Sequence, residues 1–251
     1  GTVLNLAQGA SGNNYFHFFF DIIPKIYLIK KIRIHINFYY VSAPKQWQIK
    51  IFKILGIQES ELINSSIHKH IFADQIICLD HPWYHKGFIQ DQVKKLPKWV
   101  ILINRKIFLK KASKFKCSKK IFLDRSGSRF SHCQIFNQKP INKWVKKNNL
   151  IIYKPEKLPF KKQIHLFKNA SVILGAHGAA FTNIIFCKPG TKIIEIIPTN
   201  HPNRKCERIS KILRLKYFRI VTKSDNSNKN FPFRIHLEEK HLKMIEKAIN
   251  L

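Results

Sequence analysis

The stretch Ser171-Val-Ile-Leu-Gly-Ala-His-Gly-Ala-Ala-Phe-Thr-Asn183 is the most informative segment of the chain. Val172 to Leu174 predict a buried strand, and Gly175 to Ala179 predict a loop that leads into a helix. Glycine lets a ligand approach the backbone closely and adopts φ > 0 without a Cβ penalty. Because N–H groups at a helix start attract anions, the stretch is typical of a diphosphate site. A tight turn with a structural histidine, His177, is the alternative.

A second apolar strand, Thr191-Lys-Ile-Ile-Glu-Ile-Ile-Pro198, follows the turn at Lys188-Pro-Gly190. Glu195 is the only charged residue in its central run, and a lone carboxylate there is costly to bury without a partner. Two interpretations stay open. Glu195 pairs with a basic side chain or caps a helix, or it accepts ligand hydroxyls at the carboxyl end of a parallel strand, where open α/β sheets bind ligands.

The C-terminal half alternates strands with helices, which indicates βαβ units and a parallel sheet. We expect strands at 121–123, 150–153, 172–174, 192–197 and 217–221, and helices near 141–147, 160–168, 205–213 and 237–250. The N-terminal half predicts a helix at 14–31 with Phe16, Phe19, Phe20 and Ile23 on one stripe, kinked at Pro24. Further elements are expected as a strand at 37–41, a helix from 44 to 56, short strands within 67–79 and a helix at 99–109.

The basic run at 110–120 separates these two halves and predicts an interdomain linker, with an ordinary solvated helix end as the alternative. We therefore expect an N-terminal domain at 1–115, truncated at its start. A second domain, with a parallel sheet, is expected at 116–225, followed by a C-terminal loop and helix at 226–251.

The net charge of +32 over 251 residues points to a polyanionic partner. The basic residues are scattered, however, and Lys, Ile, Asn and Phe are all heavily used. This pattern favours a compositional bias over a nucleic-acid-binding arm, and no RNP-type stacking motif is present. We expect peripheral contact with an anionic membrane and no specific nucleic acid.

The five cysteines are widely spaced and form no C-x-x-C pair, which argues against a disulfide framework or a zinc site and for a reducing compartment. Asp21, Pro24 and Lys25 interrupt the best candidate for a membrane span. No secretory signal is visible at Gly1, so we expect a cytoplasmic protein, peripheral at the inner face of the membrane. A start at Gly1 in place of Met indicates a fragment or a processed chain.

Three segments, in this order, resemble glycosyltransferase family 61. The first is Asn14-Tyr-Phe-His-Phe-Phe-Phe-Asp-Ile-Ile-Pro-Lys25. The second is Ile121-Phe-Leu-Asp-Arg125 with Arg129 and Ile135-Phe-Asn137. The third runs from Leu158 through Gly175-Ala-His-Gly-Ala179 and Asn183 to Ile194-Glu-Ile196, and it resembles the family nearly position for position.

The resemblance implies an α/β protein of GT-B architecture, with two Rossmann-like domains whose parallel sheets face a cleft. It makes 1–115 the acceptor-side domain and 116–225 the nucleotide-sugar-binding domain. It implies inverting transfer of a hexosyl or pentosyl group from a nucleotide-sugar, with UDP favoured, to a glycan or lipid-linked glycan in polysaccharide or lipopolysaccharide synthesis. No cofactor or metal is implied, and the sequence agrees because it lacks a D-x-D triplet. One departure is Gln138, which stands where the family usually has Glu.

Donor binding is assigned to seven residues, Arg125, Arg129, Gly175, His177, Gly178, Asn183 and Glu195. Arginine forks and backbone N–H groups suit a departing diphosphate. Surface, turn or helix-end roles are the alternatives for Arg129, His177 and Asn183.

The catalytic base is assigned to His17 with Asp21 as its orienter, because residues four apart lie on one helix face. The alternative is a helix-stabilising pair worth about 0.2–0.5 kcal/mol. Two other functions stay open for the whole chain. One is a basic polyanion- or nucleic-acid-binding module, and the other is a degenerate transferase that binds nucleotide without turnover, given Gln138.

Overall fold

A computed structural model of the chain describes residues 1–9, 12, 14–127, 133–199, 201, 203–225 and 233–251. The chain divides into two compact units, one formed by residues 1–92 and 97–106 and the other by residues 93–96 and 107–251. Each unit holds one parallel sheet, with four strands in the first and five in the second. The predicted α/β class with two parallel sheets is therefore confirmed.

The sheet of the first unit has the strand order β3-β2-β1-β4, and all neighbouring strands run parallel. Its strands are β1 (Thr2–Asn5), β2 (Phe38–Val41), β3 (Leu62–Asn64) and β4 (Gln75–Cys78). β1 was not expected from the sequence, because a run of four residues is too short to reveal a period. It is nevertheless an inner strand, and its Leu4 is paired in register with Tyr39 and fully buried.

The predicted helix at 14–31 is confirmed, with a wider turn in its middle. It consists of α1 (Tyr15–His17), the π-helical turn η1 (Phe18–Ile22) and α2 (Ile23–Lys31). Oδ1 of Asn14 caps the start by accepting the backbone N–H of Phe16. Pro24 lies in the first turn of α2, directly after the π-helical turn η1. Proline has no backbone N–H, which is why the sequence predicted a kink here, and the helix is widened at this place.

The other helices of the N-terminal half follow the apolar spacing of the sequence. They are α3 (Gln46–Ile54), η2 (Glu59–Glu61), α4 (Ile89–Lys94), α5 (Lys98–Phe108) and η3 (Leu109–Lys111). The helices predicted at 44–56 and 99–109 are thus confirmed as α3 and α5. None of the helices in the described ranges combines the length and the apolar character needed to cross a bilayer.

The parallel sheet of the second unit has the order β6-β5-β7-β8-β9. Its strands are β5 (Lys120–Leu123), β6 (Ile151–Tyr153), β7 (Val172–Ala176), β8 (Lys192–Pro198) and β9 (Lys216–Thr222). All five strands predicted for this half are confirmed to within two residues. Their continuous apolar runs, such as those of β7 and β8, are buried on both faces, as parallel sheets require.

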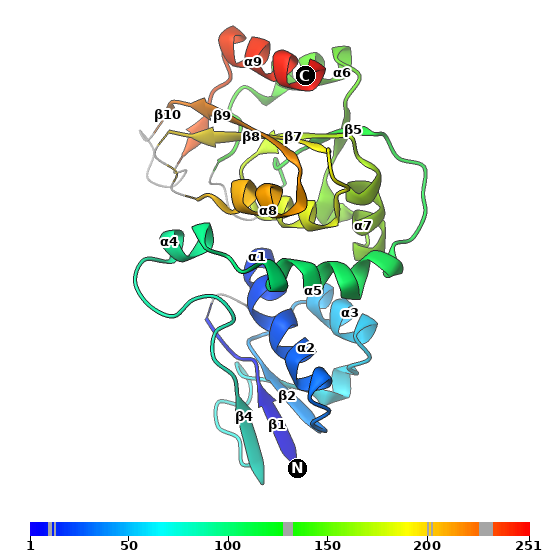
Figure 1. The fold of residues 1–251 in the computed structure, drawn as a ribbon, viewed down its shortest axis with the longest axis vertical. Helices are drawn as coiled ribbons and strands as arrows, with labels where there is room; N and C mark the ends of the chain where they lie inside the picture. Colours follow the sequence, from blue (N-terminus) through cyan, green and yellow to red (C-terminus); the bar gives the residue numbers. More distant parts are fainter. Residues whose placement is uncertain (10–11, 13, 128–132, 200, 202, 226–232) are drawn as a thin grey trace. The chain divides into compact units, whose positions relative to one another are not determined.

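Helices cover both faces of this sheet. They are α6 (Gln138–Lys147), η4 (Pro155–Lys157), α7 (Phe160–Asn169), the 3-10 helix η5 (Ala179–Phe186), α8 (Lys205–Leu213) and α9 (Glu239–Asn250). In Figure 1, α6 and α9 lie on one side of the sheet, and α7 and α8 lie on the other. Apolar residues of α6 and α9 share one core with the strands. An antiparallel pair, β10 (Ser224–Asp225) and β11 (Arg234–Ile235), contributes Ile235 to the same core.

Candidate active site

The glycine-rich segment differs in detail from its prediction. Gly175 and Ala176 belong to β7, so the loop is reduced to His177 and Gly178 before the 3-10 helix η5 begins. Gly178 is extended, with φ 172° and ψ −179°, a conformation that any residue can adopt. A positive φ therefore does not explain the glycine at this position.

Space explains both glycines instead. A β-carbon on Gly175 would lie 3.0 Å from Cβ and 3.1 Å from the carbonyl oxygen of Leu123, on the neighbouring strand β5. A β-carbon on Gly178 would collide with the guanidinium of Arg125. Arg125 follows β5 by two residues, so the ends of β5 and β7 bring an arginine and the loop together at the carboxyl edge of the sheet.

His177 is buried at this edge, with 3% of its surface exposed. Its backbone N–H donates to the carbonyl of Ile196 at 2.8 Å, and its Nδ1 lies 2.5 Å from Oε1 of Glu195. Burial lowers the pKa of His177 against the opposing influence of Glu195. A neutral imidazole that donates Nδ1–H to Glu195 satisfies both observations.

Glu195 lies in the middle of β8 and is fully enclosed by protein groups. Tyr217 donates its hydroxyl to Oε2 at 2.6 Å, and the thiol of Cys206 donates to Oε1 at 3.0 Å. Burial would raise the pKa of Glu195, but His177, Tyr217 and Cys206 outweigh it and bring the pKa to about 2. The carboxylate is thus ionised, and its observed partners are a histidine, a tyrosine and a cysteine.

Two cations lie near the His177–Glu195 pair. Lys205, the first residue of α8, is 5% exposed, and burial lowers its pKa against the pull of Cys206 and Glu195. Burial also lowers the pKa of Arg125. Lys205 was not predicted from the sequence. The chain contains many lysines, and nothing in the sequence distinguishes this buried one from the exposed ones. The region combines positive charge with limited water access, which strengthens binding of an anion.

Asn183 and Arg129 complete the predicted donor residues. Asn183 is buried in η5 and donates its amide to Oε1 of Gln163 at 2.9 Å, which ties η5 to α7. Arg129 lies outside the described residues.

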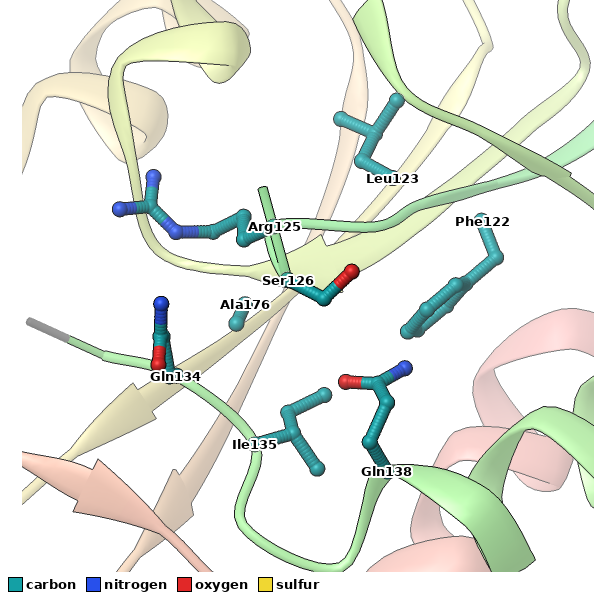
Figure 2. A pocket seen from close by; sticks show the side chains of 8 residues that line it. All are labelled: Phe122, Leu123, Arg125, Ser126, Gln134, Ile135, Gln138 and Ala176. Carbon is teal, nitrogen blue, oxygen red and sulfur yellow. The ribbon is translucent and has the colours of Figure 1, made fainter. Parts of the chain in front are cut away.

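A pocket of about 90 Å³ opens beside Arg125 (Figure 2). It is lined by Phe122, Leu123, Arg125, Ser126, Gln134, Ile135, Gln138 and Ala176. Figure 2 shows the Gln138 amide directed into it from the start of α6. Its neighbour Asn137 faces elsewhere and exchanges two hydrogen bonds with the backbone of Leu237. The pocket thus offers apolar surface with a few polar groups, as small-molecule sites do.

His17 and Asp21 form a separate cluster in the first unit. Nδ1 of His17 lies 2.8 Å from Oδ2 of Asp21, which confirms that the two side chains share a face of the helix. The structure adds three residues that the sequence did not predict. Gln8 Nε2 and Trp83 Nε1 each lie 2.8 Å from an Asp21 oxygen, and His81 Nε2 lies at 3.3 Å.

Asp21 is almost inaccessible, at 1% exposure, yet it is ionised. Burial would raise its pKa, but hydrogen bonds from His17 and His81 outweigh burial and lower it. Because the ionised carboxylate accepts a hydrogen bond from Nδ1–H of His17, the other ring nitrogen, Nε2, is left as an acceptor. Among the described residues no hydrogen-bond partner is found for this nitrogen, and the His17 side chain is 14% exposed. The arrangement is that of a base with an orienting carboxylate.

Within the described ranges, one group of side chains has the spacing of metal ligands. Donor atoms of His177, Glu195 and Cys206 lie within 4.8 Å of one another. These atoms already bond to each other through Glu195, and Lys205 and Arg125 add positive charge around them. The surroundings therefore suit an anion better than a divalent cation.

Comparison with known proteins finds one matching family model and several relatives. A family model described as Glycosyltransferase 61 matches residues 15–194. The chain is 25% identical over 222 residues to the xylan glycosyltransferase MUCI21 of Arabidopsis thaliana, covering 78% of this chain and 44% of that protein. Over 60 residues it is 40% identical to a beta-1,2-xylosyltransferase of Arabidopsis thaliana and 37% identical to beta-1,2-xylosyltransferase RCN11 of Oryza sativa subsp. japonica.

The two shorter matches cover 24% of this chain and 11% of each relative. The chain thus spans less than half the length of these relatives.

Proposed function

The chain belongs to glycosyltransferase family 61, and on that premise we propose that it moves a sugar from a nucleotide-sugar to a glycan acceptor, with inversion and without a metal ion. The observation that carries the proposal is the pairing of His17 with the buried, ionised carboxylate of Asp21 at 2.8 Å. Such a pair supplies the base that inverting transfer requires.

In the proposed reaction, Nε2 of His17 takes the proton of an acceptor hydroxyl. The acceptor oxygen attacks the anomeric carbon of the donor sugar from the face opposite the nucleotide. The new glycosidic bond forms as the bond to the diphosphate oxygen breaks, and the electron pair leaves with the nucleoside diphosphate. One displacement inverts the anomeric centre, and the chemistry needs no covalent enzyme intermediate.

Donor binding is assigned to the second unit. The developing charge on the diphosphate is met by Arg125, by Lys205 and by N–H groups at the start of η5. His177 contacts the donor, and Glu195 acts through His177 by holding its ring, because the Glu195 carboxylate is occupied by protein donors. The pocket beside Gln138 receives part of the nucleoside.

The donor we favour is a UDP-pentose, since three relatives are named as xylosyl or xylan transferases. A glycan or a lipid-linked glycan is the proposed acceptor, in polysaccharide or lipopolysaccharide synthesis. We place the protein in the cytoplasm, where a net charge of +32 favours contact with the anionic inner face of a membrane.

Isothermal titration with UDP and UDP-xylose tests donor binding. We expect millimolar or tighter affinity in the unaltered protein. Arg125→Lys should weaken binding by about 10-fold, because it removes the bidentate fork. The matched control is Arg214→Lys, on the exposed end of α8, which should bind normally.

If no nucleotide diphosphate binds while polyanions bind tightly and in a salt-dependent manner, the proposed function is wrong and a polyanion-binding module is favoured. Nucleotide binding without transfer to any acceptor would favour the degenerate transferase.

A further inference from the structure

We propose that Gln8, His81 and Trp83 are positioning residues that hold the Asp21 carboxylate and thereby fix His17 as the Nδ1–H tautomer. This inference rests on the proposed role of His17 as the base and explains how that base is prepared. Gln8 lies before the range that matches the family model, whereas His81 and Trp83 lie within it.

Four N–H donors converge on the buried Asp21 carboxylate. Oδ2 lies 2.8 Å from His17 Nδ1, 2.8 Å from Gln8 Nε2 and 3.3 Å from His81 Nε2. Oδ1 accepts the indole N–H of Trp83 at 2.8 Å. A carboxylate offers about four acceptor positions. With three donors on Oδ2 and one on Oδ1, this shell of Gln8, His81 and Trp83 around the His17–Asp21 pair opposes rotation of the carboxylate away from His17.

His81 is fixed as a donor by its own backbone contacts. Its Nδ1 accepts the backbone N–H of Tyr84 at 3.0 Å and faces that of Trp83 at 3.4 Å. The ring proton is therefore on Nε2, the nitrogen that faces Asp21. Although both histidines contact the same carboxylate oxygen, His81 presents a proton to it through Nε2, whereas His17 does so through Nδ1. Only His17 keeps Nε2 as an acceptor.

The fold brings these donors together from distant parts of the chain. Gln8 follows β1 by three residues, and His81 follows β4 by three residues. β1 and β4 are parallel neighbours, so the segments after them meet at the carboxyl edge of the sheet. The shell is therefore built into the same edge where α/β sheets place their ligands.

Charge around the carboxylate supports its role. Lys25 is 7% exposed and interacts electrostatically with Asp21, and also with Cys78 and Asp80. Together with the four donors, this lysine favours the ionised form of Asp21. An ionised Asp21 accepts a hydrogen bond from Nδ1–H of His17, whereas a neutral carboxyl can donate a hydrogen bond to Nδ1 and so favour the opposite tautomer.

Long-range ¹H–¹⁵N spectra of the histidine rings test the inference directly. The spectra are recorded at about pH 8.5, two units above the usual histidine pKa, so that rings are neutral. We expect His17 to show the Nδ1–H pattern and His81 the Nε2–H pattern, with signals assigned from His17→Gln and His81→Gln. Trp83→Phe keeps an aromatic ring but removes its N–H, and should shift His17 toward the Nε2–H tautomer.

The matched control is Trp47→Phe, because Trp47 packs on Tyr15 and Phe18 in the same unit. It should leave the His17 pattern unchanged. Gln8→Met removes a second donor and provides an independent test should Trp83→Phe fold poorly. The proposal is overturned if His17 keeps the Nδ1–H pattern in both Trp83→Phe and Gln8→Met. It is also overturned if His17 of the parental protein shows the Nε2–H pattern.

Kinetics give a second readout. His81→Gln retains an amide N–H toward Asp21 and should stay within a few-fold of the parental kcat, whereas His81→Leu should lose on the order of 10- to 100-fold with KM little changed. Equal losses in these two variants would contradict a positioning role. A failure of the proposed function gives a different result. Full transferase activity in His17→Ala would show that His17 is not the base, whichever tautomer the spectra show.

Discussion

The guanidinium of Arg125 occupies the space in which a side chain at Gly178 would begin. Because this group is the end of a flexible side chain, a methyl group at residue 178 would displace Arg125 more readily than it would disturb the fold. The glycine thus keeps an arginine at the carboxyl edge of the sheet, directly beside His177.

Gly178→Ala is therefore expected to weaken UDP binding by about 10-fold, the cost of one misplaced charge-assisted hydrogen bond, or about 1.4 kcal/mol. The free energy of unfolding should change by less than about 1 kcal/mol. Titration calorimetry and urea unfolding measure the two effects. Gly9→Ala serves as control, since a β-carbon at Gly9 would meet no other atom within 4 Å and this residue belongs to the other unit. Unchanged UDP affinity in Gly178→Ala would contradict this role of Arg125.

Acidification should destabilise the protein through His177 and Glu195. His177 has a lowered pKa when folded, so below its usual value of 6.5 the unfolded chain binds the extra proton and stability falls. Glu195 has a pKa lowered from 4.5 to about 2, so its contribution is complete above 4.5 and is lost as the pH falls toward 2. Urea unfolding between pH 7 and pH 4 should show a steady loss, and a smaller one in His177→Gln. An identical pH dependence in the variant would refute the burial of a neutral His177.

Replacing the Glu195 carboxylate itself should also be costly. Glu195→Gln leaves three donors facing an amide, with an expected loss of about 2–3 kcal/mol in the free energy of unfolding. Glu207→Gln is the matched control, because Glu207 is half-exposed and pairs with Arg204 at the surface. That substitution should change stability by less than about 0.5 kcal/mol. Similar losses of unfolding free energy in Glu195→Gln and Glu207→Gln would show that the buried hydrogen bonds of Glu195 do not stabilise the protein.

Gln138→Glu restores the residue usual for the family in the pocket beside Arg125. A carboxylate accepts hydroxyl hydrogen bonds more strongly than an amide does, so we expect UDP to bind several-fold more tightly. Asn137→Ala should leave affinity unchanged and lower stability by about 1–3 kcal/mol, because it breaks two hydrogen bonds to Leu237. Weaker UDP binding in Gln138→Glu would show that residue 138 faces the phosphates and not the nucleoside.

Metal removal should have no effect on transfer. The only described group with ligand spacing, His177, Glu195 and Cys206, is satisfied internally and is surrounded by positive charge. We expect EDTA to leave both the rate and the melting temperature unchanged. Strict dependence on Mn²⁺ or Mg²⁺ would mean that an ion, and not Arg125 and Lys205, meets the diphosphate charge.

The strands of the second unit could be predicted because parallel strands are buried on both faces and appear as apolar runs between turns. The same reasoning failed for β1, because four residues are too few to show a hydrophobic period. It also failed for the π-helical turn at Phe18–Ile22, because a stripe of apolar residues looks the same in an α-helix. The positive φ expected for Gly175 and Gly178 was wrong. Their φ angles are ordinary, and what matters is contact with Leu123 and Arg125.

The candidate site was predictable where its contacts are local. His17 and Asp21 are four residues apart, and a helical spacing was enough to bring them together. Trp83 is 62 residues from Asp21 in the sequence. The contact between the two side chains depends on how the strands pair, so no local sequence pattern predicts it. Lys205 presents the same difficulty, since burial of one lysine in a lysine-rich chain follows only from the packing of α8.

The rate of sugar transfer by His17→Ala tests the central claim most directly. With UDP-sugar and acceptor at saturation, kcat should fall by about 10²–10⁴-fold, the scale for loss of a general base, while donor affinity stays at the parental value. Asp21→Asn should give a smaller loss in kcat, and His70→Ala, on an exposed segment, should give none. A folded His17→Ala variant that turns over at the parental rate would contradict the assignment of His17 as the base.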